Sequence, residues 1–130
     1  MNGTTGNGRR EKGQLAEDLA VQHLTRNGYR IIKRNFVCNV GEIDIIAHHQ
    51  GDLVFVEVRS RNSPSDLDPV YSINRRKQKK IIKVAELYLS RHHRQPVPAR
   101  FDVVLVTLGN SPIVELIQNA FTADTDSYWP

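Results

Sequence analysis

The chain has 130 residues, of which 39% are hydrophobic and 25% are charged, values typical of a globular protein with its own core. Its single cysteine, Cys38, excludes an intramolecular disulfide framework and a cysteine-based zinc cluster, and favours a reducing compartment. No apolar run approaches the roughly 20 residues of a membrane span, and the N-terminus lacks the apolar core of a secretory signal. We therefore expect a cytoplasmic protein that does not enter a membrane.

The net charge of +4 is distributed unevenly along the chain. Residues 59–100 contain eleven Lys or Arg and three acids, a local net charge of +8, whereas residues 108–130 contain three acids and no base. A basic segment of this kind suits a polyanion such as nucleic acid. A lysine-rich helix exposed to solvent would have the same composition, so charge alone does not decide between them.

The N-terminal half of the chain predicts one helix followed by three strands. Residues 1–12 are rich in Gly, Asn, Thr and charge, and we expect them to be a disordered leader. Apolar residues at helical spacing predict a helix over residues 13–27, which Gly28 ends in the left-handed conformation. The predicted strands are residues 29–36, 42–47 and 53–59. The short polar turn at residues 48–52 predicts that the second and third strands form a hairpin.

The C-terminal half predicts a second helix and two further strands. The predicted elements are a flexible loop at 62–69, a helix at 73–91, a Pro-containing connector at 94–99, a strand at 101–107, an edge strand at 113–117 and a flexible tail at 122–130. The resulting order of helix, three strands, helix and two strands predicts an α/β fold. We expect one domain over residues 13–121, with a central mixed sheet flanked by helices.

The predicted hairpin carries acids within apolar strands. Alternation places Glu57 and Arg59 on one strand face with Leu53 and Phe55, and the intervening valines on the other. Asp44 interrupts the apolar run of the neighbouring strand, where an aspartate is unfavourable unless something pairs with it. Asp44 and Glu57 side by side would offer the oxygen ligands that Mg²⁺ or Mn²⁺ prefers. The alternative is a structural ion pair that Arg59 makes with either acid.

Two helix residues are further candidates for this site. Glu17 falls at the edge of the apolar stripe of the first helix and could add a third acid, or could equally be an ordinary helix residue beside Asp18. Gln78 lies on the stripe that faces the core in the second helix, where its amide could orient a water or phosphate. The equally weighted alternative for Gln78 is a hydrogen bond to the backbone.

Basic residues flank Gln78 on the second helix and are candidates for holding phosphates. These residues are Arg75, Arg76, Lys77, Lys79 and Lys80. Other polar residues carry weaker signals. The His48-His49 and His92-His93 pairs lack further zinc ligands, and Asp102 is expected to pair with a basic neighbour such as Arg100.

Several segments together resemble the YraN-like family of bacterial proteins, which is similar in turn to the PD-(D/E)xK nuclease superfamily. The segments are A-E-D-L-A (16–20), G-Y-R-I-I-K-R-N-F (28–36), G-E-I-D-I-I-A (41–47), L-V-F-V-E-V-R (53–59), K-Q-K-K-I (77–81) and R-F-D-V-V (100–104). The resemblance implies a restriction-endonuclease-like fold with an αβββαβ core. It implies that Asp44 and Glu57 bind Mg²⁺, with Glu17 and Gln78 in the supporting positions that some branches use.

Two positions depart from the superfamily motif. Ile43 replaces its proline and Arg59 replaces its lysine. A guanidinium stays charged and cannot act as a general base, but it can position a water or stabilise charge on a phosphate. The resemblance therefore predicts a nuclease scaffold more directly than an active enzyme.

Three functions follow from these observations. The first is a hydrolase, a metal-dependent endo- or exonuclease that acts on DNA in preference to RNA. The second is an inactive module that binds nucleic acid on the same scaffold, and the third is a protein-interaction domain with a basic face. A role in cutting junctions would predict a symmetric homodimer with two sites.

Overall fold

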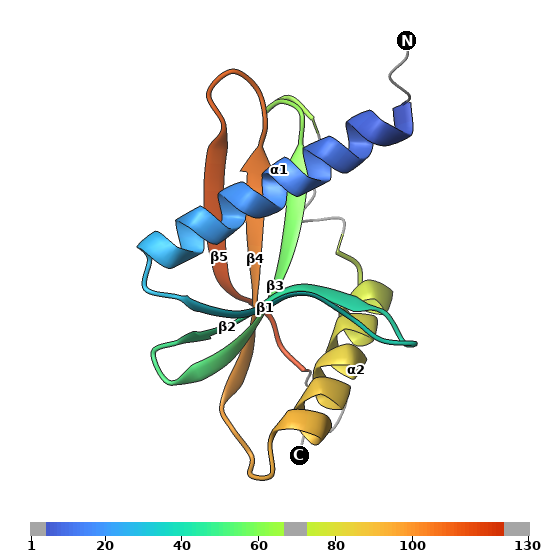
Figure 1. The fold of residues 1–130 in the computed structure, drawn as a ribbon, viewed down its shortest axis with the longest axis vertical. Coiled ribbons are helices and arrows are strands. Elements are labelled where there is room, and N and C mark those ends of the chain that lie inside the picture. Colours follow the sequence, from blue (N-terminus) through green and yellow to red (C-terminus); the bar gives the residue numbers. More distant parts are fainter. Residues whose placement is uncertain (1–4, 67–72, 124–130) are drawn as a thin grey trace.

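The computed structural model describes residues 5–66 and 73–123 (Figure 1). Its elements follow the predicted order of helix, three strands, helix and two strands. They are α1 (Thr5–Arg26), β1 (Arg30–Val37), β2 (Glu42–His49), β3 (Asp52–Arg61), α2 (Arg75–His92), β4 (Ala99–Thr107) and β5 (Ile113–Phe121). Within these two ranges, neither helix is long and apolar enough to cross a bilayer.

The five strands form one mixed sheet in the order β1-β2-β3-β4-β5. The first three strands make an antiparallel meander, which confirms the predicted hairpin of β2 and β3. Helix α2 then connects β3 to β4, which runs parallel to it, and β5 returns antiparallel at the sheet edge. The α/β class and the edge position of the last strand are therefore as predicted.

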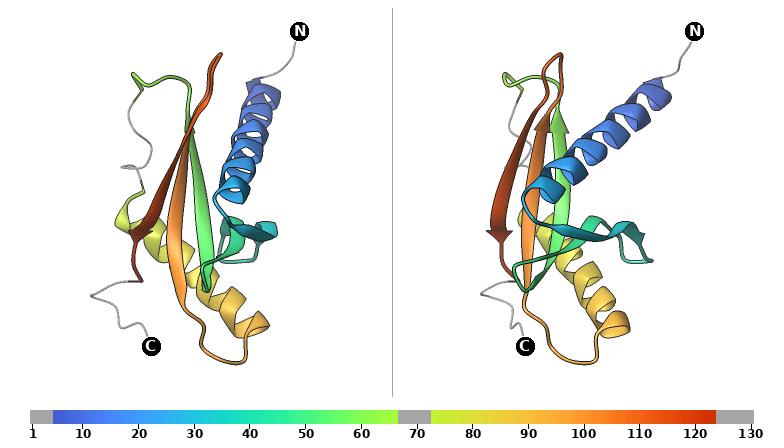
Figure 2. Two further views of the ribbon diagram at one scale, coloured as in Figure 1. Left: turned by 90° about the vertical axis from the view of Figure 1, so that its left-hand side faces the viewer. Right: turned by 60° about the vertical axis from the view of Figure 1, so that its left-hand side comes forward.

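The helices lie on opposite sides of the sheet, as the two views of Figure 2 show. Ala16, Ala20 and Leu24 recur every four residues on α1, and their buried side chains pack in one cluster with Val54 and Val56 of β3. This contact fixes α1 across one face of the sheet and leaves the other face to α2.

The second core cluster joins α2 to the alternate residues of β3. Ile81, Ala85 and Tyr88 of the helix are buried in the same cluster as Leu53 and Phe55. The alternation predicted for this strand is confirmed, with the valines facing α1 and the larger side chains facing α2. Glu57 and Arg59 follow Phe55 at the same two-residue spacing.

Helix α1 begins earlier than the sequence indicated. It starts at Thr5, so residues 5–12, which we expected in a disordered leader, form its first turns. Arg10, Glu11 and Lys12 are good helix formers, and their propensity continues the helix beyond the part that packs on the sheet. The predicted end is confirmed, because Gly28 adopts a φ of 87° and Tyr29 N donates to Leu24 O.

The turn between β2 and β3 is tighter than predicted. The strands extend to His49 and Asp52, leaving only Gln50 and Gly51 between them, both at positive φ. His49 is therefore a strand residue and not a solvated turn residue. It is 6% exposed, and its ring stacks on Tyr29 with centroids 3.9 Å apart.

Other predicted boundaries move by a few residues, as in the start of β4 at Ala99 and the extension of β5 to Phe121. The loop after β3 bends at residues 62–66, where Asp66 Oδ2 accepts hydrogen bonds from the backbone N of Asn62 and Ser63. The rest of the predicted flexible loop and nearly all of the predicted tail lie outside the described residues.

Candidate active site

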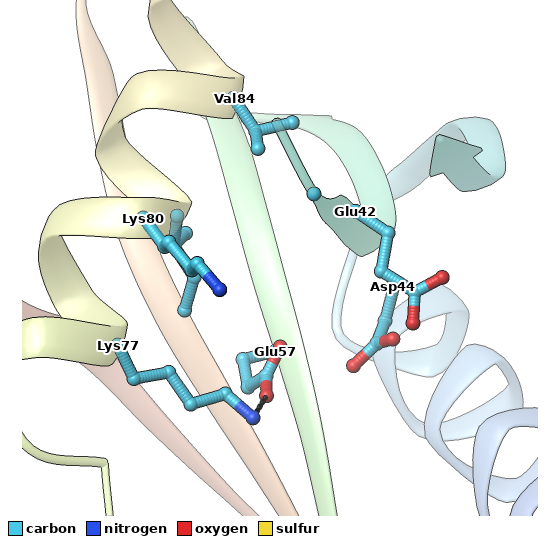
Figure 3. A pocket seen from close by; sticks show the side chains of 8 residues that line it. Glu42, Asp44, Glu57, Lys77, Lys80 and Val84 are labelled. Atoms are coloured by element: carbon cyan, nitrogen blue, oxygen red, sulfur yellow. Dashed lines mark ion pairs between the residues drawn. The ribbon is translucent and has the colours of Figure 1, made fainter. Parts of the chain in front are cut away.

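The site begins where β2 separates from β3. The antiparallel ladder runs from His49 opposite Asp52 to Ile45 opposite Val56, and the next residue of β2 is Asp44. Its side chain replaces a backbone partner, because Oδ2 accepts a hydrogen bond of 2.8 Å from Val58 N. Asp44 thus lies where β2 and β3 separate, and its side chain lines the same pocket as Glu57 (Figure 3).

The two carboxyl groups interact directly. Burial is the largest cause that raises the pKa of Asp44 to about 7, and the charge of Glu57 and a hydrogen bond between the two groups raise it further. The hydrogen bond from Val58 N lowers the pKa but does not offset these effects. Near neutral pH, the pair therefore either keeps a proton or requires a nearby cation.

Glu57 already has two basic side chains beside it. Its Oε2 lies 3.1 Å from Lys77 Nζ and 3.6 Å from Arg59 Nη1, and its side chain is only 10% exposed. Two positive charges therefore lie beside Glu57, while the raised pKa is that of Asp44. The ion pair between Arg59 and Glu57 is the structural alternative considered for the E-x-R sequence.

Lys77 reaches this position from the first turn of α2. Asn74 caps the helix, and its side chain accepts a hydrogen bond of 2.9 Å from Lys77 N. The cap fixes the backbone from which the lysine side chain extends toward β3 (Figure 3). The sequence placed Lys77 among the residues that hold phosphates and gave no indication of its contact with Glu57.

The carboxyl groups open into a pocket of about 190 Å³ between the β2–β3 hairpin and α2. The lining residues are Gly41, Glu42, Asp44, Glu57, Lys77, Lys80, Ile81 and Val84. Sequence reasoning missed Glu42, whose charge also raises the pKa of Asp44. Its position two residues before Asp44 at the start of a strand was the available signal.

Glu17 is held in a different environment. Its carboxylate pairs with Arg34 Nε and accepts a hydrogen bond of 3.2 Å from Asn35 Nδ2, both on β1. Arg34 also pairs with Asp18, so α1 and β1 share one ionic cluster. Glu17 is buried toward the sheet, as its helical position indicated, but it does not line the pocket.

Gln78 adopts the structural alternative considered for it. Its Nε2 donates a hydrogen bond of 3.0 Å to Ile73 O, and the residue does not line the pocket. The buried stripe of α2 runs through Val84 and Tyr88 in addition to Ile81 and Ala85, which leaves Gln78 at the margin of the core.

The predicted basic residues divide into two groups. Lys77 and Lys80 line the pocket, whereas Arg75, Arg76 and Lys79 are exposed on α2 outside it. All five belong to the first two turns of one helix, so the pocket opens beside a basic surface.

The predicted pairing of Asp102 with Arg100 is confirmed. Asp102 Oδ1 lies 3.1 Å from Arg100 Nε, and Asp102 is completely buried. The carboxylate also accepts hydrogen bonds from Tyr29 Oη at 2.6 Å and from Asn119 N at 2.9 Å. This acid is a structural centre that ties β4 to β5 and to the connection between α1 and β1.

Fold and pocket together define a small α/β protein in which a buried and a half-buried acid lie beside the basic first turns of a helix. The profile of the uncharacterised protein family UPF0102 matches residues 16–106, and the chain belongs to this family. A UPF0102 protein from Symbiobacterium thermophilum is 44% identical over 116 residues, covering 88% of this chain and 98% of the relative. One from Persephonella marina is 43% identical over 113 residues, covering 87% and 95%.

Proposed function

We propose that the protein is a metal-dependent hydrolase of nucleic-acid phosphodiester bonds, with a restriction-endonuclease-like fold. The observation that carries this proposal is that the interacting carboxyl groups of Asp44 and Glu57 share one pocket beside a basic helix. A fold gains no stability from holding two carboxyl groups together at low exposure, since one of them must give up its charge or find a cation. Such an arrangement is typical of a site that binds a charged ligand.

The topology supports the choice of fold. A helix precedes an antiparallel meander, and a helix then leads to a parallel strand, which is the αβββαβ order that the sequence resemblance implies. The two acids lie on the second and third strands of this core. The crossover helix contributes the basic residues that border them.

The donor atoms suit a hard divalent cation. Asp44 and Glu57 would hold Mg²⁺ or Mn²⁺ through carboxylate oxygens, with Glu42 nearby at the pocket wall. Within residues 5–66 and 73–123, no group of three or more His, Cys, Asp or Glu could hold a metal ion, so waters and substrate phosphate would complete the coordination. The ion would supply a Lewis acid that offsets charge on the phosphate.

The protein's own residues supply the remaining chemistry. Asp44 would give up its proton where a cation bound, and Glu57 pairs with Lys77 Nζ and Arg59 Nη1. Arg59, 3.6 Å from Glu57, carries a guanidinium that stabilises negative charge developing on the phosphate. The exposed bases on α2, Arg75, Arg76 and Lys79, together with Lys80, guide the nucleic-acid backbone toward the pocket.

The first experiment incubates the protein with labelled DNA and RNA structures in Mg²⁺, Mn²⁺ or EDTA. We expect cleavage that requires metal, prefers DNA, and falls by about 1,000-fold or more in Asp44→Asn and Glu57→Gln, since catalysis of this kind depends on the bound ion. Glu86→Gln removes an exposed acid of α2 and is the matched control.

Two results would contradict the hydrolase. Binding that weakens steeply with salt and survives EDTA, without cleavage, would identify a module that holds nucleic acid without cutting it. Absence of both cleavage and binding would remove nucleic acid from the function and leave the basic face of α2 to an acidic protein partner.

A further inference from the structure

Lys77 is placed where a divalent cation would also be attracted. Its Nζ lies 3.1 Å from Glu57 Oε2, closer than Arg59 on the strand, and it reaches that atom from a different element. The lysine side chain is 42% exposed, whereas the Glu57 side chain is 10% exposed. The half-exposed lysine of α2 therefore pairs with a buried acid of β3 in the pocket (Figure 3).

This ion pair is not needed to hold α2 in place. The helix is fixed by Ile81, Val84, Ala85 and Tyr88 in the core, and its first turn is capped by Asn74. An ion pair in which one side chain is largely exposed is screened by solvent and adds little to stability. The pairing instead makes the Lys77 ammonium a competitor of a divalent cation for the Glu57 carboxylate.

We propose that Lys77 couples cation binding to phosphate binding. This inference rests on the proposed function, because it assigns Asp44 and Glu57 to the cation. Without the ion, the Lys77 ammonium pairs with the Glu57 carboxylate. When the ion binds, repulsion between like charges moves the lysine away from Glu57.

The released ammonium has a defined alternative partner. Its neighbours on the first turns of α2 are basic, with Lys80 on the same pocket wall and Arg76 and Lys79 on the exposed surface. A phosphate that enters the pocket is the anion that this group of cations would accept. Cation and phosphate therefore bind with positive coupling, and the coupling is reciprocal.

The test compares Lys77→Gln with Lys77→Arg and with Arg91→Gln, an exposed base in the last turn of the same helix. Binding of Mn²⁺ to the free protein is measured by titration followed by electron paramagnetic resonance. Because Lys77→Gln removes the competing charge, we expect it to bind Mn²⁺ about five- to tenfold more tightly. Lys77→Arg keeps the charge and should stay near the wild-type affinity, as should Arg91→Gln.

A second measurement follows the coupling itself. The affinity for a labelled DNA duplex is measured by fluorescence anisotropy with Ca²⁺, a hard cation of the same charge, and with EDTA. Wild type should bind DNA about fivefold or more tightly with Ca²⁺, and Lys77→Gln should lose most of this difference. An unchanged or weaker Mn²⁺ affinity in Lys77→Gln, or an undiminished effect of Ca²⁺, would overturn the proposal.

The two proposals can fail separately. Tighter Mn²⁺ binding in Lys77→Gln, from a protein that cuts no nucleic acid, would support the coupling and refute the hydrolase. Metal-dependent cleavage with unchanged Mn²⁺ affinity in Lys77→Gln would refute the coupling alone. Failure of the wild type to bind Mn²⁺ through Asp44 would refute both.

Discussion

Two aspartates that look alike in the sequence have opposite environments in the structure. Asp44 in I-D-I and Asp102 in F-D-V each interrupt an apolar strand. Asp102 is fully buried and accepts hydrogen bonds from a phenol, a guanidinium and a backbone amide. Asp44 accepts one backbone hydrogen bond and faces a second acid. A buried acid surrounded by donors stabilises a fold, whereas one that faces another acid marks a binding site.

The two environments lie on opposite faces of the sheet. Asp102 sits opposite Val56 in the β3–β4 register, on the face that α1 covers, and Glu57 lies on the face of α2. Burial and the hydrogen bond to Asp102 raise the pKa of the Tyr29 phenol, which keeps this donor protonated. Asp44 accepts its hydrogen bond from the backbone N of Val58 and lines a pocket that is open to a ligand.

The largest expected effect on stability comes from Asp102, the acid surrounded by hydrogen-bond donors. Asp102→Asn leaves Arg100 with Asp52 as its remaining carboxylate and replaces an acceptor of several hydrogen bonds by an amide. Removing one partner of a buried ion pair costs about 3 kcal/mol or more. Urea unfolding at pH 7 should show this loss, with Glu115→Gln as an exposed control. A loss below about 1 kcal/mol would contradict the structural role of this acid.

The second prediction concerns Asp44, whose substitution should change the free energy of unfolding in the opposite direction. Asp44→Asn should stabilise the protein at pH 8 by about 1–3 kcal/mol, because the amide can still accept the hydrogen bond from Val58 N but carries no charge. The pKa of Asp44 is about 7 when folded, against an ordinary 3.8. The folded state therefore binds the extra proton, and wild-type stability falls as pH rises from about 4 through 7.

Urea unfolding of wild type and Asp44→Asn at pH 5 and pH 8, both in EDTA, measures this difference. The advantage of the variant should be smaller at pH 5, where the wild-type carboxyl is protonated in the folded protein. A variant that is less stable than wild type at pH 8 would show that Asp44 is compensated like Asp102.

Local sequence patterns predicted much of this architecture. Alternation along β3 predicted the two faces of the sheet, and the short polar turn predicted the hairpin, whereas the register that brings Asp44 beside Glu57 follows from the two-residue turn of the structure. The pairing of Asp102 with Arg100 also followed from proximity in one strand. Each of these features depends on residues that are close in sequence or joined by a hairpin.

Contacts between separate elements could not be predicted in the same way. Lys77 meets Glu57 because α2 docks at a particular angle, and Glu17 meets Arg34 because α1 crosses β1. Both contacts depend on tertiary packing, which helical periodicity does not specify. The separation of β2 from β3 at Asp44 was equally hidden, since the apolar run continues on both sides of it.

The smallest expected effect, on both stability and activity, comes from Gln78, which lies near the pocket but does not line it. Gln78→Leu removes the hydrogen bond of 3.0 Å to Ile73 O, a neutral interaction worth about 0.5–1.5 kcal/mol, and the added apolar surface offsets part of that loss. The free energy of unfolding should therefore change by less than about 1 kcal/mol. Mn²⁺ affinity and the rate of cleavage should change by less than about twofold, since the Gln78 amide already has a backbone partner. A tenfold loss of cleavage or Mn²⁺ affinity at unchanged stability would instead require the amide to leave Ile73 and turn toward the Asp44–Glu57 pocket when a ligand binds.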